Sequence, residues 1–214
     1  TLSSGATSRT SRSETGVVTP YLGLVYDLNE HWSAYASYTT IFKPQSNKDI
    51  NGTYLDPLEG VNYELGLKLQ ALDRRVQANL AVFYMDYTDM QLTSAAISYV
   101  GAPIPYVSNV GKSVIQGVEA EFLFMPLPDW RILFNGSYTH ADIKEWNEKQ
   151  TKLNAIRQSG EVSYLDRSDE PMPRVPRVQA FFLTDYTIRL PSNATITPGI
   201  SVRYTSEIYN GFDR

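Results

Sequence analysis

Cysteine is absent from the 214-residue sequence, which excludes disulfide bonds and thiolate sites in this chain. No apolar run reaches the roughly 18 residues that a transmembrane helix needs, although 42% of the residues are hydrophobic. Basic stripes are lacking as well, and a formal net charge of −4 gives no reason to expect nucleic acid as a partner. The two histidines, His31 and His140, stand in different segments, so we expect a turn residue and a strand-end residue instead of a metal site.

The beginning of the chain shows no secretory signal peptide. Residues 1–16 are polar and rich in Ser and Thr, whereas a signal peptide has a charged start followed by an apolar core. We expect these residues to form a loop or tail. Because the sequence starts without Met and reaches Arg214 without a clear stop, we also expect it to be a piece of a longer protein.

The most informative stretch is residues 60–89, which predicts a hairpin of two long strands joined by a turn at residues 72–75. Apolar and polar side chains alternate along both arms. Leu65 and Leu67, for example, lie on the apolar face, whereas Glu64 lies on the polar face. Both arms exceed the usual strand length of about 5–6 residues. Long strands with one apolar face and one polar face are typical of a membrane β-barrel, in which lipid covers one face and a watery lumen the other.

The same alternation predicts further strands on both sides of this hairpin. They cover residues 17–28, 32–41, 108–125, 177–188 and 194–205, with another that begins at Trp130. The connections are short at residues 29–31, 72–75, 126–129 and 190–193, and long at residues 42–59, 90–108 and 142–176. An outer-membrane barrel requires short turns on one rim and long loops on the other. The predicted fold class is therefore all-β, a transmembrane antiparallel β-barrel.

Trp32 and Trp130 each begin a strand directly after a short turn. In a barrel this position places both residues in the aromatic girdle at the periplasmic interface. The alternative for each is an ordinary tryptophan of an apolar core.

Five stretches follow one another along the chain. They are VTPYLGLVYDLNEHWSAYASYTTIFKPQS, LDPLEGVNYELGLK, LAVFYMDYTDMQL, SNVGKSVIQGVEAEF and MPRVPRVQAFFLTDY. Together they resemble the barrel of TonB-dependent ferric-siderophore receptors, most closely the hydroxamate and pyoverdine types. The resemblance runs from Val17 to Tyr204 with the motifs at plausible spacing, so it is far more specific than any single stretch.

The resemblance implies a 22-stranded barrel with an N-terminal plug domain inside it, and residues 17–214 would supply about eight of the strands. The plug, the TonB box and the last strands are not found in this sequence. The implied location is the bacterial outer membrane, and the implied partners are outer-membrane lipid, a ferric siderophore and, through the plug, the TonB system. Such a receptor is not an enzyme and needs no cofactor, because iron passes only as a siderophore chelate.

Candidate ligand contacts lie in the predicted long loops, where aromatic rings offer apolar area with a polar tip and Arg pairs with oxygen anions. Ferric siderophores are bulky, often anionic and rich in hydrogen-bonding groups. We expect some of the following residues to contact the cargo: Tyr54, Tyr99, Tyr106, Trp146, Arg157, Tyr164 and Arg167. The alternative for each is packing between the loops or a place in the outer girdle.

Glu119 and Glu121 share a strand face and lie about 7 Å apart, a separation that also suits the paired carboxylates of a glycosidase. Nothing else in the sequence indicates hydrolysis, so we expect both to be solvated residues of the lumen.

Two alternatives to a siderophore receptor stay open. Within the same family, the cargo is cobalamin, haem or a glycan. In a different class, the chain is a soluble β-sandwich, such as an adhesin or a carbohydrate-binding module. The sandwich predicts that four apolar residues are buried against a second sheet, namely Leu65, Leu67, Leu80 and Phe122.

Overall fold

The computed structural model describes residues 15–49, 51–97, 103–154 and 159–211, and within these ranges it contains strands and no helix. Eight strands form a continuous antiparallel path in the order β1-β2-β3-β4-β5-β6-β9-β12. Their bounds are Tyr21–Asp27 (β1), Trp32–Lys43 (β2), Leu58–Ala71 (β3), Val76–Ile97 (β4), Pro103–Leu127 (β5), Trp130–Glu145 (β6), Val178–Tyr186 (β9) and Gly199–Thr205 (β12). The all-β prediction with about eight strands is confirmed.

Four more strands form two hairpins outside this path. β7 (Asn147–Asn154) pairs with β8 (Ser159–Asp166) and also meets β4 in parallel at Ile97. β10 (Ile188–Arg189) pairs with β11 (Thr195–Ile196).

Two predicted long loops are wrong in extent. The ladder between β4 and β5 continues from Met90 opposite Val110 to Ile97 opposite Pro103, so most of residues 90–108 is an extended hairpin. The segment 142–176 likewise contains the end of β6 and the β7–β8 hairpin. In both cases pairing along the ladder gives the backbone N–H and C=O groups partners that a loop would have to find elsewhere.

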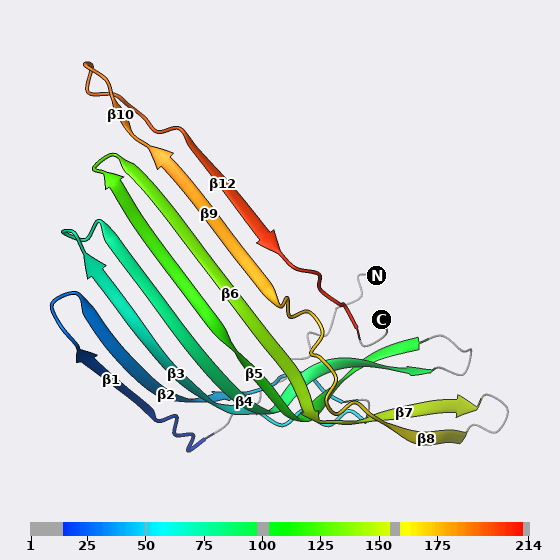
Figure 1. Ribbon diagram of the computed structural model, residues 1–214. Coiled ribbons are helices and arrows are strands. Elements are labelled where there is room, and N and C mark those ends of the chain that lie inside the picture. Colours follow the sequence, from blue (N-terminus) through cyan, green and yellow to red (C-terminus); the bar gives the residue numbers. More distant parts are fainter. Residues whose placement is uncertain (1–14, 50, 98–102, 155–158, 212–214) are drawn as a thin grey trace, which may run out of the picture.

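All four short connections lie at the same end of the strands, toward the left and top of Figure 1, and the long connections lie at the opposite end. The β3–β4 turn has its hydrogen bond from Arg75 N to Leu72 O, and φ is positive at three residues in a row, with values of 53° at Leu72, 52° at Asp73 and 66° at Arg74. This left-handed backbone, uncommon for residues other than glycine, lets the chain reverse within four residues. The predicted division into a short-turn rim and a long-loop rim is confirmed.

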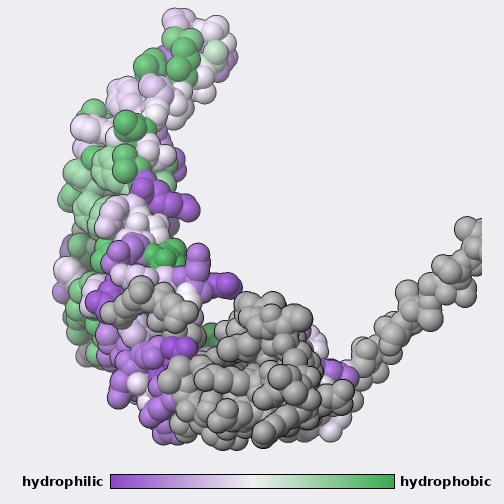
Figure 2. Space-filling view, turned by 90° about the vertical axis from the view of Figure 1, so that its right-hand side faces the viewer, coloured by the Kyte–Doolittle hydropathy of each residue, from purple (hydrophilic) through white to green (hydrophobic). Residues whose placement is uncertain are grey.

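One face of the sheet is apolar across the strands. A single row of directly opposed residues runs through Leu65, Val82, Val118, Tyr138 and Val178, on β3, β4, β5, β6 and β9. Figure 2 shows a curved wall whose convex side is largely hydrophobic and whose concave side is largely hydrophilic. This is the distribution of a barrel wall that faces lipid outside and water inside.

The sandwich alternative is wrong. Leu65 and Leu80 are 58% and 49% exposed, and Leu67 and Phe122 are 41% and 38% exposed. No second sheet of the described residues covers them, so the apolar face is open to its surroundings.

Trp32 and Trp130 both lie on this apolar face at the short-turn rim, opposite Leu69 and Tyr186 respectively. The core alternative is wrong for both, since the two residues are 40% and 39% exposed. The indole Nε1 of Trp130 donates a hydrogen bond to Thr184 Oγ1 at 2.9 Å. An exposed ring with its N–H satisfied suits the interface between lipid and water.

Candidate ligand-binding rim and inner wall

Polar side chains line the concave face in rows across neighbouring strands. One row runs through Lys68, Asn79, Glu121 and Asn135. Glu119 lies one row closer to the long-loop rim, opposite Ala81 and Ser137. No ion pair joins Glu119 or Glu121 to another residue within the described ranges.

The inner wall is tightly fitted where β2 meets β3. Tyr35 Oη donates a hydrogen bond to Glu64 Oε1 at 2.6 Å, and Lys68 Nζ lies 4.8 Å from the centre of the Tyr35 ring. The ring covers Gly66, which has no side chain to compete for that space. The result is a fixed polar surface on the lumen side.

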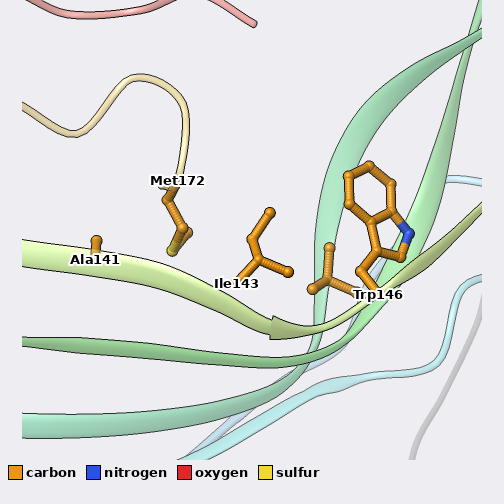
Figure 3. Close-up of a cluster of buried hydrophobic side chains, with 5 residues drawn as sticks. Ala141, Ile143, Trp146 and Met172 are labelled. Atoms are coloured by element: carbon orange, nitrogen blue, oxygen red, sulfur yellow. The ribbon is translucent and has the colours of Figure 1, made fainter. Parts of the chain in front are cut away.

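At the long-loop rim, five buried apolar side chains form a cluster, namely Val110, Ala141, Ile143, Trp146 and Met172. Figure 3 shows Ala141 and Ile143 pointing from β6 toward Met172, which comes from the segment before β9. Backbone hydrogen bonds hold that segment to β6, because Met172 N donates to Ala141 O at 2.9 Å and Ile143 N donates to Glu170 O at 2.9 Å. The cluster is therefore a small core that anchors the connection between β8 and β9.

Two of the predicted ligand contacts belong to this framework. Trp146 is only 4% exposed and packs within the cluster. Arg167 N donates to Trp146 O at 2.9 Å, and Arg167 Nη1 lies 3.4 Å from each carboxylate oxygen of Glu170. Both placements fit the alternative of packing between loops.

Tyr54 lies on a different segment, the connection between β2 and β3. It forms an isolated bridge with Lys48, whose Nζ lies 4.6 Å from the centre of the tyrosine ring. Tyr54 is half-buried.

The other four predicted contacts are placed only in part. Tyr106 lies on β5 opposite Ser94, and Tyr164 lies on β8 opposite Lys149. Tyr99 and Arg157 lie outside the described residues.

Sequence reasoning missed a group of polar residues that join the β2–β3 connection to β4 and β5. Gln45, 8% exposed, donates from Nε2 to Asp56 O at 2.5 Å and to Asp89 O at 2.6 Å. Asn109 Nδ2 donates to Asp89 O at 2.7 Å and to Asp56 O at 3.3 Å, and its Oδ1 accepts from Asp56 N at 3.0 Å. No local sequence pattern marks these residues, because their partners lie far away along the chain.

Asp89 is a titratable group at this junction, beyond the apolar part of β4. Burial raises the pKa of its carboxyl group above the ordinary value, and the nearby carboxylates of Asp56 and Glu59 add to the rise.

Each of the two histidines has a carboxylate close by. His140 Nε2 lies 2.9 Å from Asp142 Oδ2, and His31 Nε2 lies 3.9 Å from Glu30 Oε1. Within the described ranges, no three or more His, Cys, Asp or Glu side chains are grouped to hold a metal ion.

Comparison with known proteins gives one family match. The profile of the family described as TonB dependent receptor-like, beta-barrel, matches residues 1–213. The ferric-pyoverdine 358 receptor of Pseudomonas putida is 42% identical over 130 residues, which are 60% of this chain and 16% of the relative. The ferric-pyoverdine BN7/BN8 receptor of the same species is 43% identical over 173 residues, which are 80% and 20% of the two chains.

Solved structures agree with this match. The alcaligin outer-membrane receptor FauA from Bordetella pertussis superposes with a TM-score of 0.55 at 28% identity, covering 88% of this chain and 29% of the receptor. The chain thus spans between 16% and 29% of the length of these three proteins.

Proposed function

Because the chain belongs to the TonB-dependent receptor β-barrel family, whose members are bacterial outer-membrane proteins, we propose that it forms part of the wall of a receptor that imports a ferric siderophore. The two relatives described above are named as ferric-pyoverdine receptors, which makes a pyoverdine-type chelate the first cargo to test. The observation that carries the proposal is the curved sheet itself, with an apolar convex face and a polar concave face.

The receptor captures and transports without bond chemistry. Its loops bind the chelate at the cell surface, and a plug domain in the lumen, moved by the TonB system, lets it pass to the periplasm. The concave face supports this role because Glu119 and Glu121 offer carboxylates without an ion-pair partner among the described residues. A domain that fills the lumen would bring cationic side chains against them, since charges that lose water need partners.

Tyr54 is our preferred cargo contact among the predicted residues that have described side chains, because it is half-buried on the β2–β3 connection, whereas Trp146 is only 4% exposed. Trp146 and Arg167 act as a framework that holds the neighbouring segment. Tyr99, Tyr106, Arg157 and Tyr164 are kept as candidate contacts.

The test is uptake of radioactive iron by cells that lack their own siderophore receptors and express the full-length protein. The cells are given iron chelated by hydroxamate, catecholate and pyoverdine-type siderophores, with and without a working TonB. We expect TonB-dependent uptake of a pyoverdine-type chelate. Failure to take up any chelate, by a protein shown to be in the outer membrane, would overturn the siderophore proposal and move the cargo to cobalamin, haem or a glycan.

A further inference from the structure

Four residues form a junction between three elements at the long-loop rim. Gln45 comes from the β2–β3 connection, as does Asp56, while Asp89 belongs to β4 and Asn109 to β5. We call this group the amide clasp, because the side-chain amides of Gln45 and Asn109 together hold the carbonyl oxygens of Asp56 and Asp89.

The clasp sits at a break in the β4–β5 ladder. Thr88 is opposite Lys112 and Met90 is opposite Val110, but Asp89 has no partner in the register. Its φ of 59° lies in the left-handed region, which is uncommon for a residue other than glycine. The Asp89 carbonyl accepts both amides of the clasp, one from Gln45 and one from the side chain of Asn109 on the neighbouring strand.

Burial distinguishes the clasp from a chance contact of a surface loop. Gln45 is 8% exposed, and the neighbouring Leu55 is 3% exposed. Asp56 itself is exposed, and Asp89 and Asn109 are half-buried, so removing one amide would loosen the connection locally without unfolding the sheet. The chain therefore fixes the β2–β3 connection to the wall at this point.

What the clasp holds in place is the segment that carries Tyr54. Tyr54 lies two residues before Asp56, whose N–H and C=O both belong to the clasp. The intervening Leu55 N donates to Asn47 O at 3.0 Å, so the strand-like pairing of the connection continues up to the clasp. A loosened clasp would let the segment that carries Tyr54 sample several positions.

We propose that Gln45 and Asn109 are positioning residues that hold Tyr54 in the geometry that binds the cargo. The inference rests on the proposed function, because it assigns Tyr54 to the cargo site. A binding group held in place before the ligand arrives does not pay the ordering cost on binding, so the clasp raises affinity without touching the cargo. If the productive position falls to a tenth of its population, the apparent affinity falls about tenfold.

The first experiment compares Gln45→Met and Asn109→Leu with the wild-type full-length receptor. Both substitutions keep the approximate shape of the side chain and remove its amide. Gln77→Met is the matched control, since Gln77 Nε2 donates to Arg74 O at 3.1 Å at the opposite rim. Measured quantities are the KM and maximal rate of uptake of the cargo that the wild type imports, and the Tm of the purified receptor.

We expect the KM to rise about tenfold in both clasp variants, with the maximal rate and Tm close to wild type, and no change in Gln77→Met. An unchanged KM in the clasp variants, or an equal rise in the control, would overturn the proposal.

The second experiment asks whether the clasp acts through Tyr54. Gln45→Met is combined with Tyr54→Ala, and the KM changes are compared in a double-mutant cycle. If the clasp positions Tyr54, Gln45→Met raises the KM much less once Tyr54 is gone. If Gln45→Met raises the KM by the same factor with and without Tyr54, the proposal is overturned, because a merely structural role of Gln45 predicts that outcome.

Hydrogen exchange tests the clasp without any cargo and so separates it from the proposed function. The Asp56 amide donates to Asn109 Oδ1, so its protection should fall in Asn109→Leu and stay unchanged in Gln77→Met. If the wild type imports none of the chelates, the siderophore proposal fails, but the hydrogen-exchange measurement still tests whether the clasp holds the connection. Loss of protection at Asp56 in Asn109→Leu supports the clasp, and unchanged protection there overturns it.

Discussion

The Tyr35 ring of β2 lies directly over Gly66 of β3, on the lumen side of the sheet. A Cβ added at Gly66 would lie 2.6 Å from Tyr35 Oη and against the ring carbons next to it. The same hydroxyl donates to Glu64 Oε1 at 2.6 Å, so the ring is held in place from one end. The absence of a side chain at Gly66 is therefore a condition for the Tyr35–Glu64 contact.

Gly66→Ala is expected to destabilise the folded receptor by about 1–3 kcal/mol, because the added methyl group forces Tyr35 out of its position. Thermal unfolding in detergent, followed by the loss of β-sheet circular dichroism, measures the effect. Gly211→Ala is the control, since a Cβ at Gly211 would meet nothing within 4 Å. Equal Tm values for the two variants would show that Tyr35 moves aside without cost.

A charged side chain placed on the apolar convex face should destabilise the receptor, and more so the closer it lies to the middle of the membrane. Leu80 lies in the middle of the apolar part of β4 and is 49% exposed. We expect Leu80→Arg to cost about 2–4 kcal/mol and to reduce the amount of receptor assembled in the outer membrane.

The control for the lipid face is Ser37→Arg, because Ser37 is opposite Glu64 in the register and shares its polar face. Its assembly, measured by the amount of protease-resistant receptor in outer-membrane fractions, should stay close to wild type. Similar losses in both variants would argue against a lipid environment for the convex face.

Trp146→Ala is expected to loosen the connection before β9, because the indole is 4% exposed and belongs to the buried cluster at the long-loop rim. Removal of a buried Trp side chain typically costs about 3–5 kcal/mol. The backbone amides of Ile143 and Met172 donate hydrogen bonds between β6 and the segment before β9. Their hydrogen-exchange rates therefore measure how far this connection is loosened. Trp130→Ala should leave those amides unchanged, and rapid exchange in both variants would contradict a local role for Trp146.

Alternation along the chain predicted the part of the fold that crosses the membrane. In residues 76–84 the face of each side chain is set locally by strand geometry, so apolar and polar positions separate without knowledge of the partner strand. The same holds for Trp32 and Trp130, whose places follow from the short turns before them. The membrane thickness also fixes how long the alternation must last.

The rim was less predictable because its contacts connect distant segments. Trp146 looks like a ligand contact in sequence, and its place in a cluster with residues of β5, β6 and the segment before β9 makes it a core residue. Gln45 and Asn109 stand in no sequence pattern that predicts their contact. The left-handed backbone at Asp89 is not indicated by the sequence either, because the residue is not a glycine. Polar contacts of this kind are decided by tertiary geometry, which single-sequence periodicity does not contain.

The acid-base behaviour of Asp89 gives a prediction for the clasp itself. Burial, with the carboxylates of Asp56 and Glu59, raises the pKa of Asp89 above its ordinary value of 3.8. A raised pKa means that the folded junction prefers the protonated carboxyl. The ionised form therefore weakens the junction above that pKa, and the weakening disappears as the pH falls toward 3.8.

Asp89→Asn should remove this pH dependence, because asparagine is neutral and tolerates the left-handed φ of 59° at this position. The protection factor of the Asp56 amide, corrected for intrinsic exchange, is measured at about pH 4, near the ordinary pKa, and at pH 7 in both proteins. We expect wild-type protection to be greater at the lower pH, and protection in Asp89→Asn to be the same at both values. The same pH dependence in both proteins would assign the effect to another group, and the remaining carboxylates at the junction, Asp56 and Glu59, would then be the ones to substitute.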